Sequence, residues 1–113
     1  MLVPPLFIQF VLGAKGVMPA NAKSLLHLCE VIPPGTNWAV VEGSVGFLPL
    51  AILATAMGGH VRVGLEECIH YSEGRLAKSN AELVERIVEM ARACGREVAS
   101  PAEARKILWP PGA

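Results

Sequence analysis

The chain has 113 residues, of which 52% are hydrophobic, and its ten basic side chains balance ten acidic ones. That length holds one domain or less, and a neutral chain without a basic cluster offers no electrostatic footprint for nucleic acid or an anionic membrane. Its apolar runs fall short of the roughly 20 residues that cross a bilayer, and its start lacks the features of a signal peptide. Its three separated cysteines suit reduced thiols. We therefore expect a cytoplasmic protein with no nucleic-acid or membrane partner.

The first half of the chain alternates between strand and helix patterns. Residues 5–12 form a continuously apolar run of strand length, which is typical of a central parallel strand with no solvated face. Asn21 is expected to cap a helix over 22–30, and a second strand follows over 38–42. The next helix, over 47–57, has almost no polar side, so we expect it to be covered on several sides.

Residues 58–67 carry the charges that most suggest chemistry. Read as a strand over 60–65, the stretch has alternating faces, one of them apolar and formed by Val61, Val63 and Leu65. Arg62 and Glu66 share the opposite face, and if that face is buried they must be paired or ligated, because an isolated buried charge is costly. Glu66 and Glu67 fall at the carboxyl end of this strand, where parallel α/β proteins place their sites.

The remainder reads as an irregular segment over 68–78 followed by two helices. Ser79 and Glu82 predict a capping box, and the helix after it has an apolar stripe. The stripe comprises Leu83, Ile87, Met90, Ala91 and Cys94. Ser100, followed by a proline, predicts the start of a second, short helix that reaches residue 108.

This order predicts an α/β fold of parallel (β/α) units. An eight-unit barrel takes about 250 residues, so three units with extra C-terminal helices make a partial TIM (β/α)8 barrel. We expect residues 1–113 to be a single fragment, the carboxyl-terminal portion of a TIM-barrel domain. Its unpaired strand edges would bind other chains, so the missing N-terminal strands or further copies of the chain are expected partners.

Four segments carry a resemblance that covers nearly the whole chain in unbroken order. They are FIQFVLG (7–13), GGHVRVGLE (58–66), LAKSNAELV (76–84) and PAEAR (101–105). Together they resemble the carboxyl-terminal part of the β-keto acid cleavage enzymes. The resemblance implies a zinc-dependent (β/α) barrel that condenses a β-keto acid with acetyl-CoA and cleaves the adduct into acetoacetate and a new CoA thioester.

The same resemblance assigns roles at the end of the third strand. Glu66 matches the carboxylate that binds zinc, and Arg62 matches an arginine that works with the acidic residue after that ligand, which here is Glu67. A divalent cation stabilises an enolate, and an adjacent carboxylate held by arginine can take the α-proton. Arg62 lies four residues before Glu66, about 13 Å along an extended strand, so its side chain must reach toward the mouth of the barrel.

The sequence departs from the family pattern in three places. Glu67 and Cys68 stand where the family has aspartate and asparagine, and residues 46–49 are apolar where the family tends to carry a polar Gly-Arg-type stretch. The family's His-x-His pair of zinc ligands has no counterpart among the three histidines. One ligand cannot hold catalytic zinc, so activity would require the missing N-terminal strands.

Several alternatives stay open. Arg62 and Glu66 could be a structural ion pair, and Glu66, Cys68 and His70 could form a local metal site if the chain stayed extended. The loop at 13–16 could contact a CoA phosphate, although ordinary turn chemistry explains it as well. The whole chain could also be a non-catalytic, oligomerising fragment or relic of the family.

Overall fold

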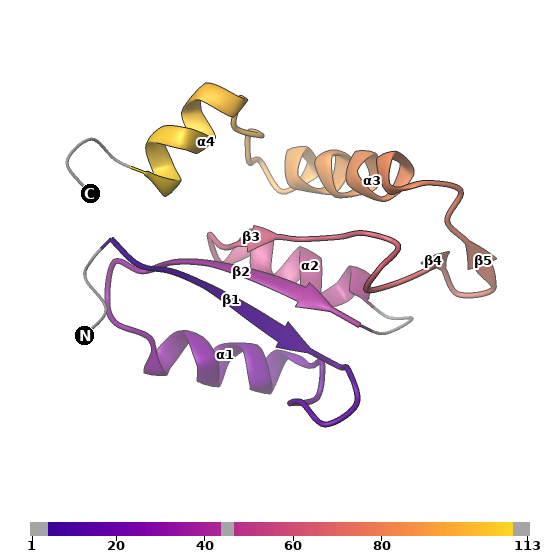
Figure 1. Ribbon diagram of the computed structural model, residues 1–113, viewed down its shortest axis with the longest axis horizontal. Coiled ribbons are helices and arrows are strands. Elements are labelled where there is room, and N and C mark those ends of the chain that lie inside the picture. Colours follow the sequence, from indigo (N-terminus) through magenta and orange to yellow (C-terminus); the bar gives the residue numbers. More distant parts are fainter. Residues whose placement is uncertain (1–4, 44–46, 110–113) are drawn as a thin grey trace.

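A computed structural model describes residues 5–43 and 47–109. It contains five strands and four helices within these ranges (Figure 1). In chain order they are β1 (Phe7–Leu12), α1 (Ala22–Val31), β2 (Asn37–Glu42), α2 (Phe47–Ala56), β3 (His60–Val61), β4 (His70–Ser72), β5 (Arg75–Leu76), α3 (Asn80–Ala93) and α4 (Pro101–Leu108). No helix in this described part is long and apolar enough to cross a membrane.

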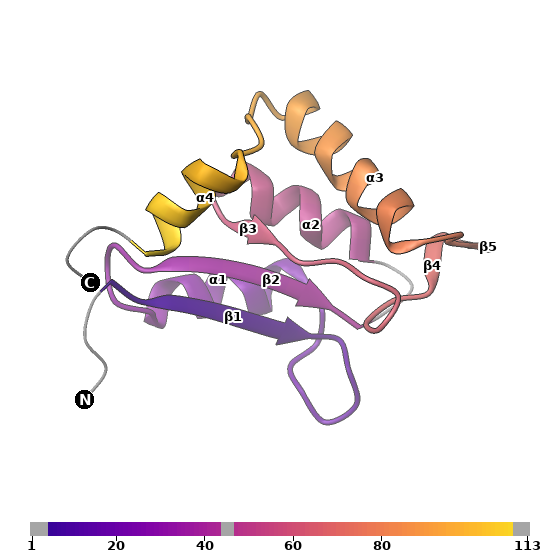
Figure 2. The same ribbon diagram turned by 45° about the horizontal axis from the view of Figure 1, so that its top comes forward.

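The first three strands form one parallel sheet in the order β1-β2-β3. Phe7 pairs with Asn37 at one end of the β1–β2 ladder, and Leu12 pairs with Glu42 at the other. The three strands therefore run in the same direction, and their carboxyl ends lie on the side of the molecule that carries the β4–β5 hairpin (Figures 1 and 2). The prediction of an α/β fold with parallel strands linked by helices is confirmed.

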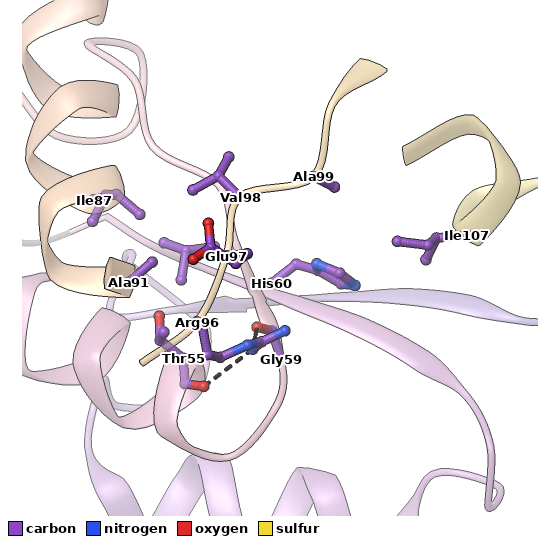
Figure 3. A pocket seen from close by; sticks show the side chains of 11 residues that line it. Thr55, Gly59, His60, Ile87, Ala91, Arg96, Glu97, Val98, Ala99 and Ile107 are labelled. Carbon is purple, nitrogen blue, oxygen red and sulfur yellow. Dashed lines mark hydrogen bonds between the residues drawn. The ribbon is translucent and has the colours of Figure 1, made fainter. Parts of the chain in front are cut away.

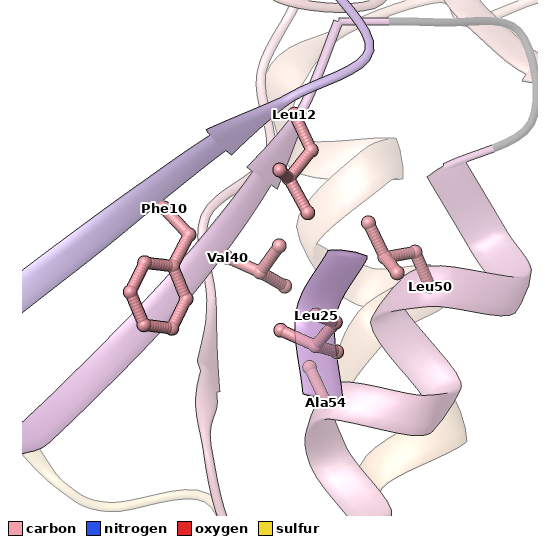
Figure 4. Close-up of a cluster of buried hydrophobic side chains, with 6 residues drawn as sticks. All are labelled: Phe10, Leu12, Leu25, Val40, Leu50 and Ala54. Carbon is pink, nitrogen blue, oxygen red and sulfur yellow. The ribbon is translucent and has the colours of Figure 1, made fainter. Parts of the chain in front are cut away.

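The main hydrophobic core lies between one face of the sheet and helices α1 and α2. Alternate side chains of β1 and β2 point into it because side chains alternate across a strand (Figure 4). The buried members are Phe10, Leu12, Leu25, Val40, Leu50 and Ala54. Helix α2 contacts the sheet, α1 and α3, which explains its apolar composition and confirms that it is covered on several sides.

A second core joins α2, α3 and the segment after β3. Ala51, Cys68 and Leu83 are buried there. Val61, Val63 and Leu65, which were predicted to share an apolar face, pack around these residues. Ile87 and Met90, from the predicted apolar stripe of α3, pack there too. Cys94 lies outside this core and is exposed because it follows the last residue of α3, so its assignment to the stripe was wrong.

Strand β1 lies at an edge of the sheet, which corrects the prediction of a central strand with no solvated face. Within the described residues its one neighbour is β2. Phe7 and Val11, on the face away from α1 and α2, are 46% and 42% exposed. A run of apolar residues shows the composition of both faces but not what covers them. The described residues cover the second face of β1 only in part.

The third strand is shorter than predicted. Its ladder with β2 pairs Ala39 with His60 and Val40 with Val61, and it is extended by one hydrogen bond from the Arg62 amide to the Val40 carbonyl. The prediction that the strand continues to residue 65 is wrong, because the chain turns at Gly64. The segment at 68–78, predicted as irregular, contains the antiparallel β4–β5 pair.

Candidate functional site

The charged cluster at the end of β3 is where the sequence placed it. Arg62 Nη2 lies 2.9 Å from Glu66 Oε2 and 3.0 Å from Glu67 Oε1, so one nitrogen serves both carboxylates. Val61 packs against both cores, whereas the side chain of the next residue, Arg62, is 43% exposed. The structure therefore brings together all three predicted site residues.

A turn, rather than a long reach along a strand, makes these contacts. The amides of Glu67 and Cys68 both donate to the carbonyl of Gly64, at 3.1 and 3.0 Å. This turn folds Glu66 and Glu67 back over Arg62. The sequence expectation of about 13 Å assumed extended backbone, and that assumption fails at Gly64.

The cluster is accessible to solvent. The side chains of Arg62, Glu66 and Glu67 are 43%, 80% and 22% exposed, so the charged face is not buried here, although its side chains are paired. Exposed ion pairs contribute only about 0–1 kcal/mol to stability. The pairs therefore orient the side chains without contributing much to the fold.

A further carboxylate, which the sequence reasoning did not single out, ends the neighbouring strand. Glu42 is the last residue of β2 and is only 7% exposed. It lines a small hollow together with Arg62 and Val61. Its position as a charged residue at the carboxyl end of a buried strand was the available signal.

The described residues do not by themselves fit a zinc ion. No three histidine, cysteine, aspartate or glutamate side chains in 5–43 and 47–109 lie close enough together to hold a metal. Glu66 is largely in solvent, whereas Cys68 is buried with its thiol 3.6 Å from the carbonyl of His70, so the local site of Glu66, Cys68 and His70 is not formed. Catalytic zinc takes three protein ligands as a rule, and the described residues do not form such a set.

The loop after β1 is closed by its own backbone. The Gly13 amide donates to Met18 O at 2.9 Å, and Val17 donates to Ala14 O at 3.3 Å. Gly13 and Gly16 have φ values of 79° and 84°, which glycine adopts at no steric cost. Turn chemistry therefore accounts for this loop without a phosphate.

A cavity of about 230 Å³ lies near the other end of β3, between the start of that strand and the segment that links α3 to α4 (Figure 3). Arg96 crosses its floor and donates to the carbonyls of Thr55 and Gly59 at 3.1 and 2.8 Å. Burial, and secondarily the Arg96 charge, lower the pKa of His60, which lines the same cavity. Arg62, Glu66 and Glu67 are not among the residues that line this cavity, although an adjoining hollow that shares His60 and Val61 with it reaches Arg62.

The fold and the cluster together define a class of protein: a parallel (β/α) protein whose charged site follows the carboxyl end of a strand. A sequence model of the β-keto acid cleavage enzymes matches residues 1–109, nearly the whole chain. The chain belongs to the β-keto acid cleavage enzyme family.

Several characterised relatives are similar over almost all of this chain. A 3-keto-5-aminohexanoate cleavage enzyme from Fusobacterium nucleatum is 48% identical over 104 residues, and one from Acetoanaerobium sticklandii is 41% identical over 104 residues. A 3,5-dioxohexanoate:acetyl-CoA acetone transferase from Paraburkholderia graminis is 32% identical over 114 residues. These matches cover 92%, 92% and 97% of this chain but only 38%, 38% and 37% of the relatives, so the chain spans less than two fifths of their length.

Proposed function

We propose that this chain supplies the last three (β/α) units of a zinc-dependent TIM-barrel enzyme that converts a β-keto acid and acetyl-CoA into acetoacetate and a new CoA thioester. The observation that carries the proposal is the contact of Arg62 with both Glu66 and Glu67 at the carboxyl end of β3. The coverage of the relatives supports it, because 38% of their length is close to three eighths, the share that three units of an eight-unit barrel would occupy.

Glu67 is proposed as the base that removes the α-proton. Its Oε1 is held by Arg62 and its side chain is 22% exposed, so the carboxylate is both oriented and accessible. Glu66 is proposed as one zinc ligand, with the other ligands supplied from outside this chain. Its side chain is 80% exposed, so a group that approaches from solvent can reach this carboxylate while Oε2 contacts Arg62.

The open surfaces of the sheet support completion by further strands. In the described chain β1 and β3 are the two edges of the parallel sheet, and unpaired edges present backbone donors and acceptors to other chains. The exposed Phe7 and Val11 side chains add apolar surface on the face away from α1 and α2. We propose that this face becomes the barrel interior when the missing N-terminal strands are present.

The test is complementation. The chain would be co-expressed with the amino-terminal portion of the Fusobacterium relative. The complex would be assayed with zinc, acetyl-CoA and either 3-keto-5-aminohexanoate or 3,5-dioxohexanoate, the acids in the names of the relatives above. We expect acetoacetate and a new thioester from at least one acid. Glu67→Gln should remove turnover, whereas Glu73→Gln, at an exposed position between β4 and β5, should not. A purified complex that forms no thioester from any of these acids would contradict the proposal.

The same edges support a second candidate, a non-catalytic assembly of identical copies. Two chains could pair β1 edges or cover the apolar face formed in part by Phe7 and Val11. Size-exclusion chromatography of the chain alone discriminates between the candidates. A stable oligomer that fails to take up the amino-terminal portion favours the assembly of copies, whereas a chain that forms a one-to-one complex with that portion favours the enzyme.

A further inference from the structure

A long-range hydrogen bond fixes the turn that carries the two carboxylates. Asn80 is the first residue of α3, and its Oδ1 accepts a hydrogen bond of 2.7 Å from the amide of Leu65. Fifteen residues separate the two partners. Asn80 is free for this contact because Ser79 caps the helix, its hydroxyl accepting from the Glu82 amide at 3.1 Å.

The turn and the helix approach each other closely at this point. A Cβ on Gly64 would lie 3.3 Å from Asn80 Oδ1, which is tighter than an ordinary van der Waals contact. On its other side the turn is closed by the Gly64 carbonyl, which accepts from Glu67 and Cys68. The backbone from Gly64 to Cys68 is therefore held both from within and from α3.

This contact sets where the carboxylates point. Leu65 directly precedes Glu66, so a shift of the Leu65 amide moves Glu66 and Glu67 relative to Arg62. The ion pairs are exposed and contribute little to stability. The hydrogen bond from Leu65 to Asn80 is exposed too, but it is short and joins the turn to α3. In general, a displacement of about 1 Å in a catalytic group lowers a rate by as much as a hundredfold.

We propose that Asn80 is a positioning residue for the Arg62, Glu66 and Glu67 cluster. Asn80 acts on these three side chains through its hydrogen bond with the Leu65 amide. The catalytic part of this inference rests on the proposed function, but the structural part does not.

The first test uses the chain alone. Asn80→Ala should speed hydrogen exchange of the Leu65 amide by roughly fivefold or more, because one hydrogen bond is worth about 1 kcal/mol. It should also broaden or shift the Arg62 guanidinium ¹⁵N resonances. Asn80→Asp keeps an acceptor oxygen at the same place and should retain both signals. Gly64→Ala places a Cβ 3.3 Å from Asn80 Oδ1, so the side chain or the turn must shift by a few tenths of an ångström, and the Leu65 amide resonance should shift with it.

Asn37 offers a matched control. Its side-chain amide also makes a long-range bond, to the carbonyl of Ile107 at 3.3 Å, but it lies at the amino end of β2. Asn37→Ala should leave the Leu65 and Arg62 signals unchanged. Unchanged Leu65 exchange and unchanged Arg62 resonances in Asn80→Ala would overturn the inference.

The second test uses the complemented enzyme. Asn80→Ala should lower kcat by about 10- to 100-fold with little change in the KM for acetyl-CoA, and Asn80→Asp should restore most of kcat. Loss through general unfolding would not be rescued by the aspartate. Equal kcat in wild type and Asn80→Ala would overturn the catalytic role of Asn80. No turnover in wild type or in any variant would overturn the proposed function instead. The hydrogen-exchange results would then decide the structural role.

Discussion

Gly59→Ala tests how tightly the start of β3 is packed against the sheet. A Cβ at residue 59 would lie 2.3 Å from two ring carbons of Trp38 and 2.7 Å from a third. The Trp38 ring cannot move away freely, because it packs against Phe10 with a ring-centroid distance of 5.7 Å. The substitution must therefore displace either the indole or the backbone that leads into β3.

Forcing an extra carbon into a packed site typically costs about 1–3 kcal/mol. For a domain of this size the melting temperature should fall by roughly 4–12 °C, measured by circular dichroism and by urea unfolding. Trp38→Leu removes the ring atoms that clash. In a double-mutant cycle we therefore expect the cost of Gly59→Ala to shrink in the Trp38→Leu background.

Gly58→Ala provides the matched control. Gly58 has a φ of 89°, and no atom of the described residues lies within 4 Å of the added carbon. Its cost, about 1 kcal/mol, therefore comes from backbone strain. That cost should be the same with and without the Trp38 ring. The packing argument is refuted if Gly59→Ala is as stable as wild type, or if Trp38→Leu reduces both penalties equally.

Three further predictions concern charged groups. Burial and the Arg96 charge lower the pKa of His60 below 6.5, so the native state binds fewer protons than the unfolded state. The free energy of unfolding should therefore fall as the pH drops from above 6.5 through the lowered pKa. His60→Gln should remove this pH dependence in urea unfolding experiments. Arg96→Leu should cost about 2 kcal/mol, because it removes charged hydrogen bonds to two carbonyls, and NMR should show the pKa of His60 rising. Hydrogen bonds from the Ser100 hydroxyl, and then from the Ser100 backbone amide, hold the pKa of Glu103 below 4.5. In Ser100→Ala, an NMR titration of the Glu103 carboxyl should show a higher pKa. Any stability that the lowered pKa contributes is lost as the pH falls through that pKa.

Local signals in the sequence located most of the fold. Asn21, Ser79 and Ser100 were predicted as helix caps, and each side chain accepts from the expected backbone amide three residues on. Capping depends on residues within one turn of the helix, so the printed sequence contains all the necessary information. The capping box at Ser79 is only half formed, because Glu82 accepts from the Lys78 amide instead of the Ser79 amide.

Features that depend on distant neighbours could not be predicted in the same way. The alternation after His60 correctly showed which side chains share a face, but it could not show that the ladder stops once β2 pairing ends. The association of Arg62 with Glu66 and Glu67 was correctly predicted, whereas the turn that makes it and the hydrogen bond from the Leu65 amide to Asn80 were missed. A partner 15 residues away leaves no periodic signal in the sequence.

The shared Nη2 atom of Arg62 makes the two glutamates energetically dependent on each other. Whatever withdraws Glu66 from that nitrogen leaves the guanidinium with Glu67 as its remaining partner in the cluster. Substitution at either carboxylate therefore changes the environment of the other, and single-variant data at these positions will not add. Their individual contributions become separable only when measurements at position 66 are repeated with position 67 altered.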